Sequence, residues 1–429
     1  MNERELKFLE IEKEVNSRGG DGAAVLDAYR EYYAFHEVRM CEWLARLFDP
    51  DIGGFYYSNS ARDNDILVRW DGVTCKGLPD IESTMQALQF LKWTGIIESS
   101  MELPEWMRSK IRDFTCSLMS SEDGYFYHPQ WGKDISDARR GRDLDWGVGL
   151  ANSLGFKLPC PSAYERMKAA KAEADGGRKA ESAAIPEYLK SRESLVKHLE
   201  GLDFDTKAYS SSNLLSTQIR RIAIAGYSDV VCDFLDSIQK KDTGTWGNVG
   251  GYTGVNALLK VLNVYSVAGR AVPNPERAAM SAMDAISIAE DNTTVCYQFN
   301  TWWSVAMVRQ SLKKHGGEEG QKILARVDGE MLRRAPECIR ATVKKIAPFK
   351  CSDGSYSYFK THTCPLSQGA LVAMDGVKEG DINATTINSQ GVLNQSLYAL
   401  GLDRVAPSVF DKDALDMFIS ALPAPKKVV

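Results

Sequence analysis

Residues 228–269 read SDVVCDFLDSIQKKDTGTWGNVGGYTGVNALLKVLNVYSVAG, which is two helical patterns joined by a turn of glycine and an aromatic residue. The first pattern has a narrow apolar stripe and a charged opposite face, as expected of an outer helix; the stripe is Val231, Phe234, Leu235 and Ile238. The second pattern has the i, i+3, i+4, i+7 spacing of a buried helix face; its apolar residues are Val255, Leu258, Leu259 and Leu262. This stretch therefore predicts a helical hairpin.

The same order of outer helix, loop and inner helix recurs along the chain. The predicted inner helices each end in glycine, which suits the left-handed conformation just past a helix; they are 80–95, 145–155, 211–226, 252–269, 300–316 and 382–401. Four of the loops join glycine to aromatic residues; they are GGFYY at 53–57, DGYFY at 123–127, GTWG at 244–247 and DGSYSYF at 353–359. Six such hairpins predict an all-α fold, an (α/α)6 toroid around a central cavity.

We expect residues 1–429 to form one domain, because a toroid can grow around its centre beyond the size of an ordinary domain. The alanine, lysine and glutamate stretch at 164–184 breaks the rhythm and is predicted to be a surface insertion, helical or mobile. A division into two domains at that stretch is the alternative.

Composition narrows the function classes. The net charge is −5, which gives no electrostatic footprint for nucleic acid. No run of about 18 apolar residues predicts a membrane span, and residues 1–20 lack the apolar stretch of a secretory signal. The nine cysteines are scattered without CxxC spacing, which favours reduced thiols and a cytoplasmic protein.

No motif predicts a cofactor. The chain lacks a glycine-rich phosphate loop, an HExxH pair and a nucleophile elbow. Asp203 and Asp205 resemble paired metal ligands but have no third ligand nearby, so no metal is expected. The oligomeric state is left open.

Two segments carry a resemblance to known families. FLDSIQKKDTGTW at 234–246 resembles the QW motif of squalene-cyclase-like proteins, and GGYTGVNALLKVL at 250–262 resembles an inner helix of protein prenyltransferase β-subunits. This resemblance implies the terpenoid-cyclase and prenyltransferase toroid superfamily. The DxDD acid of the cyclases and the zinc site of the transferases have no counterpart here. Six-hairpin glycosidases and toroidal polysaccharide lyases are similar in architecture, and GGFYY is similar to turns found there.

Polar residues gather where three inner helices are predicted to begin. They are Asp80 and Glu82; Arg140, Arg142, Asp143 and Asp145; and Glu379, Asp381 and Asn383. If all inner helices run the same way, their N-termini meet at one rim, which favours carboxylates, hydroxyl-rich ligands and anions. Each acid has the alternative role of an N-cap.

The first hypothesis is a glycan-cleaving enzyme acting on a hydroxyl-rich or acidic saccharide, a glycoside hydrolase before a lyase. Hydrolysis needs two carboxylates, for which Asp80, Asp145 and Asp381 are the candidates. A lyase needs a base and cations that neutralise a uronate carboxylate. Tyr252, His128 or His362 is then the base, and Arg140 and Arg142 bind the anion; Glu82, Glu379 and Asn383 complete the predicted polar binding residues.

The loop and helix-start aromatics have two interpretations: packing between hairpins, or stacking on a substrate. The candidates for a substrate platform are Tyr56, Trp131, Trp246, Trp302 and Trp303. Of the adjacent pair Trp302 and Trp303, one must point away from the cavity. Aromatic surfaces suit isoprenoids as well as sugars, so an isoprenoid cyclase or transferase is the second hypothesis. A non-catalytic binding toroid is the third.

Overall fold

The computed structural model describes residues 3–175 and 185–425. The prediction of a predominantly helical chain is confirmed. The helices before the predicted insertion at 164–184 are α1 (Glu3–Ser17), α2 (Gly22–Ala34), α3 (Met40–Arg46), α4 (Asn59–Asp63), α5 (Ile81–Trp93), α6 (Glu105–Ser117) and α7 (Asp137–Leu154). α8 (Ala163–Asp175) overlaps the predicted insertion. The helices after it are α9 (Arg192–Glu200), α10 (Phe204–Ala225), α11 (Ser228–Ile238), α12 (Gly251–Ala268), α13 (Pro275–Ser287), α14 (Cys296–His315), α15 (Gly317–Ile346), α16 (Ile382–Thr386), α17 (Val392–Leu400) and α18 (Asp413–Ala421).

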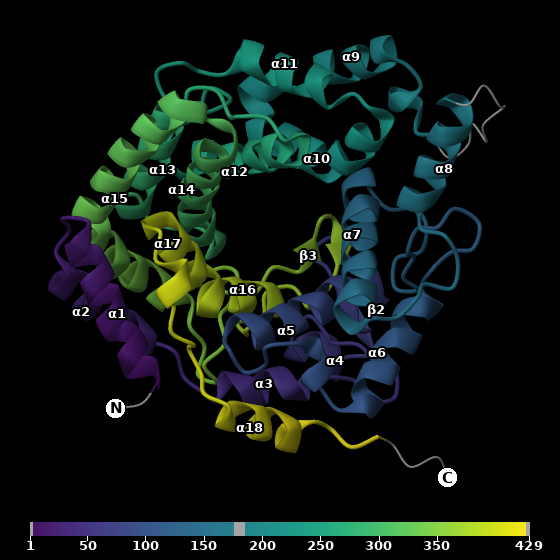
Figure 1. Ribbon diagram of the computed structural model, residues 1–429. Coiled ribbons are helices and arrows are strands. Elements are labelled where there is room, and N and C mark those ends of the chain that lie inside the picture. Colours follow the sequence, from purple (N-terminus) through teal and green to yellow (C-terminus); the bar gives the residue numbers. More distant parts are fainter. Residues whose placement is uncertain (1–2, 176–184, 426–429) are drawn as a thin grey trace.

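Six inner helical segments contact one another in a closed circuit. α5 packs on α7, α7 on α10, α10 on α12, α12 on α14 and α14 on α17. A π-helical turn at Ile387–Gly391 joins α16 to α17, and α16 packs back on α5. Figure 1 shows these segments around a common centre, with α6, α9, α11, α13 and α15 outside them. The chain thus returns to its first inner helix through its last.

The ends of the chain lie on the outside of this circuit. α1 and α2 pack together, and α2 packs on α15. α18 packs on α3, on the side of α3 that faces away from the centre of the circuit (Figure 1). In the described residues, no helix combines the length and the apolar character that crossing a bilayer requires.

The glycine-aromatic loops anchor each hairpin to its neighbour. The aromatic residue two positions after the loop glycine is fully buried; these residues are Phe55, Phe126, Trp246 and Tyr356. Gly53 has φ +95°, and a Cβ there would lie 2.2 Å from the backbone oxygen of Lys110 in α6. Gly354 has φ +86°, and a Cβ added there would lie 3.3 Å from the Cγ of Arg39, next to α3. The loop of the last hairpin therefore abuts the outer helix of the first.

Some predicted boundaries shift. α7 begins at Asp137 rather than at 145, because Ser136 caps it by accepting from the amide of Arg139. Arg140, Arg142, Asp143 and Asp145 consequently lie inside the helix. The left-handed glycine after α14 is Gly317 (φ +59°) and not Gly316, which stays helical (φ −81°). The left-handed caps at Gly155, Gly226, Gly269 and Gly401 agree with the prediction.

Two short β-hairpins interrupt the helices, and the apolar pattern did not predict them. β1 (Ile66–Val68) pairs antiparallel with β2 (Thr74–Lys76), and β3 (Leu366–Ser367) pairs antiparallel with β4 (Ala370–Leu371). Within the predicted insertion, α8 packs on α10, and residues 176–184 lie outside the described residues.

Candidate functional site

A cavity of about 630 Å³ lies at the centre of the helical circuit. The first two turns of every inner helix contribute to its wall, so the helix N-termini do share one cavity; the residues are Gln86, Arg142, Tyr209, Asn256, Asn300 and Asn383. Other amides in the wall are Gln89, Gln368 and Gln395, and the aromatic rings are those of Trp93, Trp146, Tyr209, Tyr297, Phe299, Trp303 and Tyr358. Among the described residues, no carboxylate lines this cavity.

A second cavity of about 470 Å³ adjoins the first and shares four wall residues with it: Arg142, Trp146, Lys260 and Trp303. It extends toward the C-terminal ends of the inner helices, as α12 shows. Thr253 and Asn256 line the first cavity, Lys260 lines both, and Asn263 lines the second. These positions follow one face of a helix, so the two cavities form one channel along the inner helices.

Two side-chain atoms of the channel wall that are shielded from solvent lack a hydrogen-bond partner among the described residues. Gln86 is 4% exposed, and its Oε1 accepts no hydrogen bond, while its Nε2 donates to Asn383 Oδ1 at 3.0 Å. The indole Nε1 of Trp146 donates to no acceptor. Because buried polar groups are nearly always satisfied, one acceptor and one donor in the wall are free for a ligand.

Lys260, like Arg142, is a cation at the junction of the two cavities. Its amine makes no hydrogen bond or ion pair with any described residue. Burial, reinforced by the positive charge of Arg142, lowers the pKa of Lys260 to about 8. About a tenth of the amine is then uncharged at pH 7, compared with roughly one part in three thousand for an ordinary lysine. Lys260 therefore offers either a cation or a base to a ligand.

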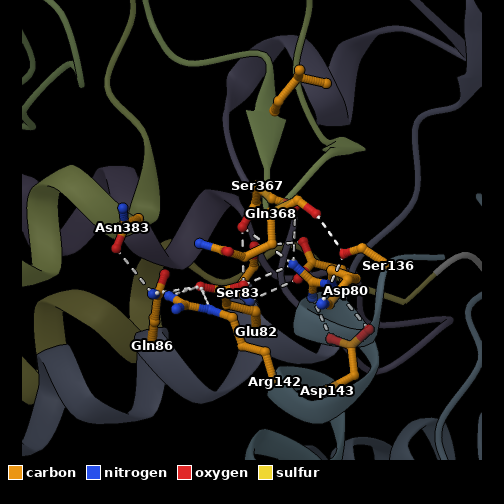
Figure 2. Close-up of polar contacts among 12 residues, drawn as sticks. Asp80, Glu82, Ser83, Gln86, Ser136, Arg142, Asp143, Ser367, Gln368 and Asn383 are labelled. Atoms are coloured by element: carbon orange, nitrogen blue, oxygen red, sulfur yellow. Dashed lines mark hydrogen bonds and ion pairs between the residues drawn. The ribbon is translucent and has the colours of Figure 1, made fainter. Parts of the chain in front are cut away.

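Arg142 is held by the buried carboxylate of Glu82, as Figure 2 shows. Its Nε donates to Glu82 Oε1 at 2.8 Å and its Nη2 to the same oxygen at 2.5 Å. Arg139 donates through Nη1 to Glu82 Oε2 at 2.8 Å and forms an ion pair with Asp143. Burial alone would raise the pKa of Glu82, but Arg142 and Arg139 outweigh it and hold that pKa at about 2. The Nη1 of Arg142 has no partner in this network.

Two of the three predicted catalytic acids are helix caps. Asp80 is 2% exposed and accepts from the amide of Ser83 at 2.9 Å at the start of α5. Asp381 is fully buried and accepts from the amide of Ala384 at 2.7 Å at the start of α16, and from Thr363 Oγ1 at 2.7 Å. Burial raises the pKa of each to about 6. Neither lines the channel.

The third acid, Asp145, lines the second cavity. Its Oδ1 accepts from the Tyr164 hydroxyl at 2.7 Å and lies 3.6 Å from Arg220 Nη1. Burial raises its pKa. The structure thus does not bring the predicted trio together around one space.

Of the predicted binding residues, Arg142, Trp303 and Asn383 line the channel. Trp302 instead lies in the core and donates to Thr342 Oγ1 at 2.9 Å. One of the two adjacent tryptophans therefore faces the channel and the other points away from it, as expected. Trp246 is buried in the same way and donates to the Leu235 carbonyl at 2.9 Å.

The remaining predicted residues lie outside the channel wall with partners of their own. His128 Nε2 lies 2.5 Å from the Pro79 carbonyl oxygen, and burial lowers the His128 pKa to about 4. Trp131 packs on His128, and Tyr252 stacks on Tyr297 with ring centres 4.6 Å apart. The others are Glu379, bonded to Ser58 and Ser60; Tyr56, bonded to Asp49; Arg140, over the Tyr125 ring; and His362, stacked on Phe359. Their substrate roles stay predictions.

The sequence interpretation missed Lys260 and most of the amides. A signal was present in α12, because Thr253, Asn256, Lys260 and Asn263 form a polar stripe at helical spacing in an otherwise apolar segment. A polar stripe on a buried helix indicates a lined cavity.

In the parts of the chain that the structure describes, no cluster of three or more His, Cys, Asp or Glu side chains is arranged to hold a metal ion. Comparison of the chain with protein-family models, with curated proteins and with solved structures found no match.

Proposed function

We propose that the closed circuit of helices is an (α/α)6 toroid of the terpenoid-cyclase and prenyltransferase class, and that its central channel binds and cleaves an acidic saccharide. The fold assignment is supported by the return of α16 to α5 and by the burial of Trp246 in the QW-like segment. The function is argued separately, because a fold hosts many functions.

The composition of the channel wall carries the functional proposal. Amides and tryptophans suit the hydroxyls and the flat faces of sugars, and Arg142 with Lys260 suits a carboxylate. The free acceptor on Gln86 and the free donor on Trp146 match a ligand whose hydroxyls both donate and accept.

Between hydrolysis and elimination, the wall favours elimination. A glycoside hydrolase needs two carboxylates that flank the scissile bond. Asp80 and Asp381 are occupied as caps, and Asp145 is the one member of the predicted trio that lines the channel. A lyase needs a cation at the uronate carboxylate and a base for the neighbouring proton, and Arg142 and Lys260 supply these groups.

In the proposed reaction, Arg142 Nη1 pairs with the uronate carboxylate and makes the adjacent C–H more acidic. The uncharged amine of Lys260 removes that proton, and the C–O bond to the leaving sugar breaks as a C=C bond forms. The neighbouring Cys296, together with burial, keeps the pKa of Tyr358 well above its usual value, so its phenol stays protonated. Tyr358 lines the same cavity as Arg142 and Lys260, and it is the donor assigned to the leaving oxygen.

The test is a panel of uronate-containing and neutral polysaccharides, with the ultraviolet absorbance of the unsaturated uronate as the readout. We expect the wild type to release unsaturated product from at least one acidic polymer, and Lys260→Met and Arg142→Met to lose it. Lys322→Met is the matched control, because Lys322 is an exposed cation on α15 paired with Glu319. Reducing sugar without unsaturated product would indicate hydrolysis instead.

One observation favours the isoprenoid alternative. A groove of about 860 Å³ with a mostly apolar wall, including Phe156, Leu158 and Ile224, meets the second cavity at Val148, Asn152 and Arg220. A prenyl diphosphate would place its anion near Arg142 and its tail in this groove. Tight binding of a prenyl diphosphate, with no product from any saccharide, would support that function over the lyase.

A further inference from the structure

The β3–β4 hairpin ends in a turn that its sequence does not favour. Gln368 has φ +49° and Gly369 has φ +87°, the combination of a type I′ turn. Such turns prefer Asn-Gly, because asparagine tolerates the left-handed region better than residues with longer side chains. Within the described residues, Gln368 and Asn274 are the non-glycine positions with positive φ. A longer side chain than the turn favours indicates a second requirement at this position.

Three inner helices hold this turn at the channel, as Figure 2 shows in part. From α5, Glu82 Oε2 accepts from the Ser367 hydroxyl at 3.0 Å. Beside α7, the Ser136 hydroxyl donates to the Gln368 carbonyl at 3.3 Å. From α10, Asn213 Nδ2 donates to Gln368 Oε1 at 3.0 Å. Glu82 also holds Arg142, so one buried carboxylate positions both the cation and the turn.

The Gln368 amide faces the central cavity, whose wall it joins with Gln86, Arg142 and Asn383. Its oxygen is occupied by Asn213, whereas its Nε2 donates to no described residue. An amide nitrogen offers two N–H donors. The hairpin therefore presents a fixed donor to the same space that the Arg142 guanidinium faces.

We propose that Gln368 is a specificity-determining residue whose Nε2 donates to a carboxylate or hydroxyl oxygen of the saccharide. The inference rests on the proposed function and adds to it a second fixed contact beside Arg142. Glu82 is the positioning residue, because it ties Ser367 and Arg142 into one geometry.

The test is Gln368→Asn, which creates the preferred Asn-Gly turn and keeps the amide but shortens its reach by one methylene. We expect KM for the acidic polymer to rise roughly tenfold, the effect of one lost hydrogen bond to a charged group. We expect kcat to change by less than about twofold and the melting temperature not to fall. Gln368→Gly should behave in the same way.

Asn274→Gly is the matched control, because Asn274 has φ +47° at the start of α13, away from the channel. The KM of the Asn274→Gly variant should stay at the wild-type value.

The two proposals fail differently. If the wild type neither binds nor cleaves any acidic saccharide, both are overturned. If the wild type is active and Gln368→Asn has an unchanged KM, the inference about Gln368 is overturned and the lyase proposal stands. A fall in melting temperature with KM unchanged would assign the residue a purely structural role and would equally overturn it.

Discussion

Lys260 gives the channel wall an amine that is partly uncharged near neutral pH. Because burial and then Arg142 lower its pKa to about 8, the base is protonated below that pH and free above it. We therefore expect the rate of elimination at low substrate concentration to rise about tenfold per pH unit below pH 8 and to level off above it. A pH profile of kcat/KM measures this. Arg142→Lys should shift the pH at the midpoint of this profile. A flat profile across pH 7 to 9 would show that Lys260 is not the base.

Asp80 and Asp381 are caps in this structure, and their substitution separates capping from catalysis. Asparagine also caps helices, so Asp80→Asn and Asp381→Asn should lower the free energy of unfolding by less than about 1 kcal/mol at pH 7, while alanine at either position should cost about 1 kcal/mol or more. Urea unfolding measures both. If an asparagine variant folds normally but has lost all activity, the carboxylate that it replaces is catalytic and not only a cap.

The same two carboxylates give stability a pH dependence with a defined sign. Burial raises their folded pKa to about 6, above the ordinary 3.8. Their protonation therefore favours the folded state, and this contribution is fully present below pH 3.8 and is lost as the pH rises through 6. Substitution by asparagine should flatten the stability profile between those two values.

At the scale of elements, Glu82 is the contact that joins α5, α7 and the β3–β4 hairpin. Glu82→Gln leaves the buried guanidinium of Arg139 and the partly exposed one of Arg142 short of a counter-charge, and breaking a buried ion pair costs about 3 to 5 kcal/mol. The matched control is Glu276→Gln, which removes an exposed pair with Arg326 and should cost less than about 1 kcal/mol. Equal effects on the free energy of unfolding would contradict the importance of the buried network.

The loop glycines hold neighbouring hairpins together by close packing. Gly53→Ala places a Cβ 2.2 Å from the Lys110 carbonyl oxygen, so the loop must move away from α6. Gly72→Ala is the matched control: its φ is +83°, yet its Cβ would have open space around it. The control isolates the cost of the left-handed conformation, about 1 to 2 kcal/mol. Thermal unfolding should show a clearly larger loss for Gly53→Ala.

The sequence predicted the inner helices well, the start of α7 less well and the two β-hairpins not at all, and each result has a physical reason. Helical spacing identified all six inner helices, because burial of one face leaves a local trace in the sequence. The left-handed glycines Gly155, Gly226, Gly269 and Gly401 marked the ends of four of them. The predicted start of α7 was eight residues too late, because the first turns of this helix are held by Ser136 and by the buried Glu82 network. The partners in that network lie far apart in the chain. The β-hairpins were missed because strands of two or three residues have too few positions to show alternation.

At the scale of the whole molecule, the sequence predicted the rim better than the channel. Clusters of acids beside helix starts suggested catalysis, but Asp80 and Asp381 turn into the first helical turn and leave the wall to amides and cations. Lys260 stands seven residues after Thr253 on α12, and its importance depends on which face of that helix the neighbouring helices leave uncovered. That face is set by the packing of α12 against α10, α11, α13 and α14, which no local pattern specifies.

The most direct measurement of the central claim is the release of unsaturated uronate from an acidic polysaccharide by the wild type, Lys260→Met and Lys322→Met side by side. The lyase account predicts product from the wild type and Lys322→Met, and a loss of at least about a hundredfold in rate for Lys260→Met with its melting temperature preserved. Product formation by Lys260→Met at the wild-type rate, or none by the wild type on any uronate polymer, would contradict it.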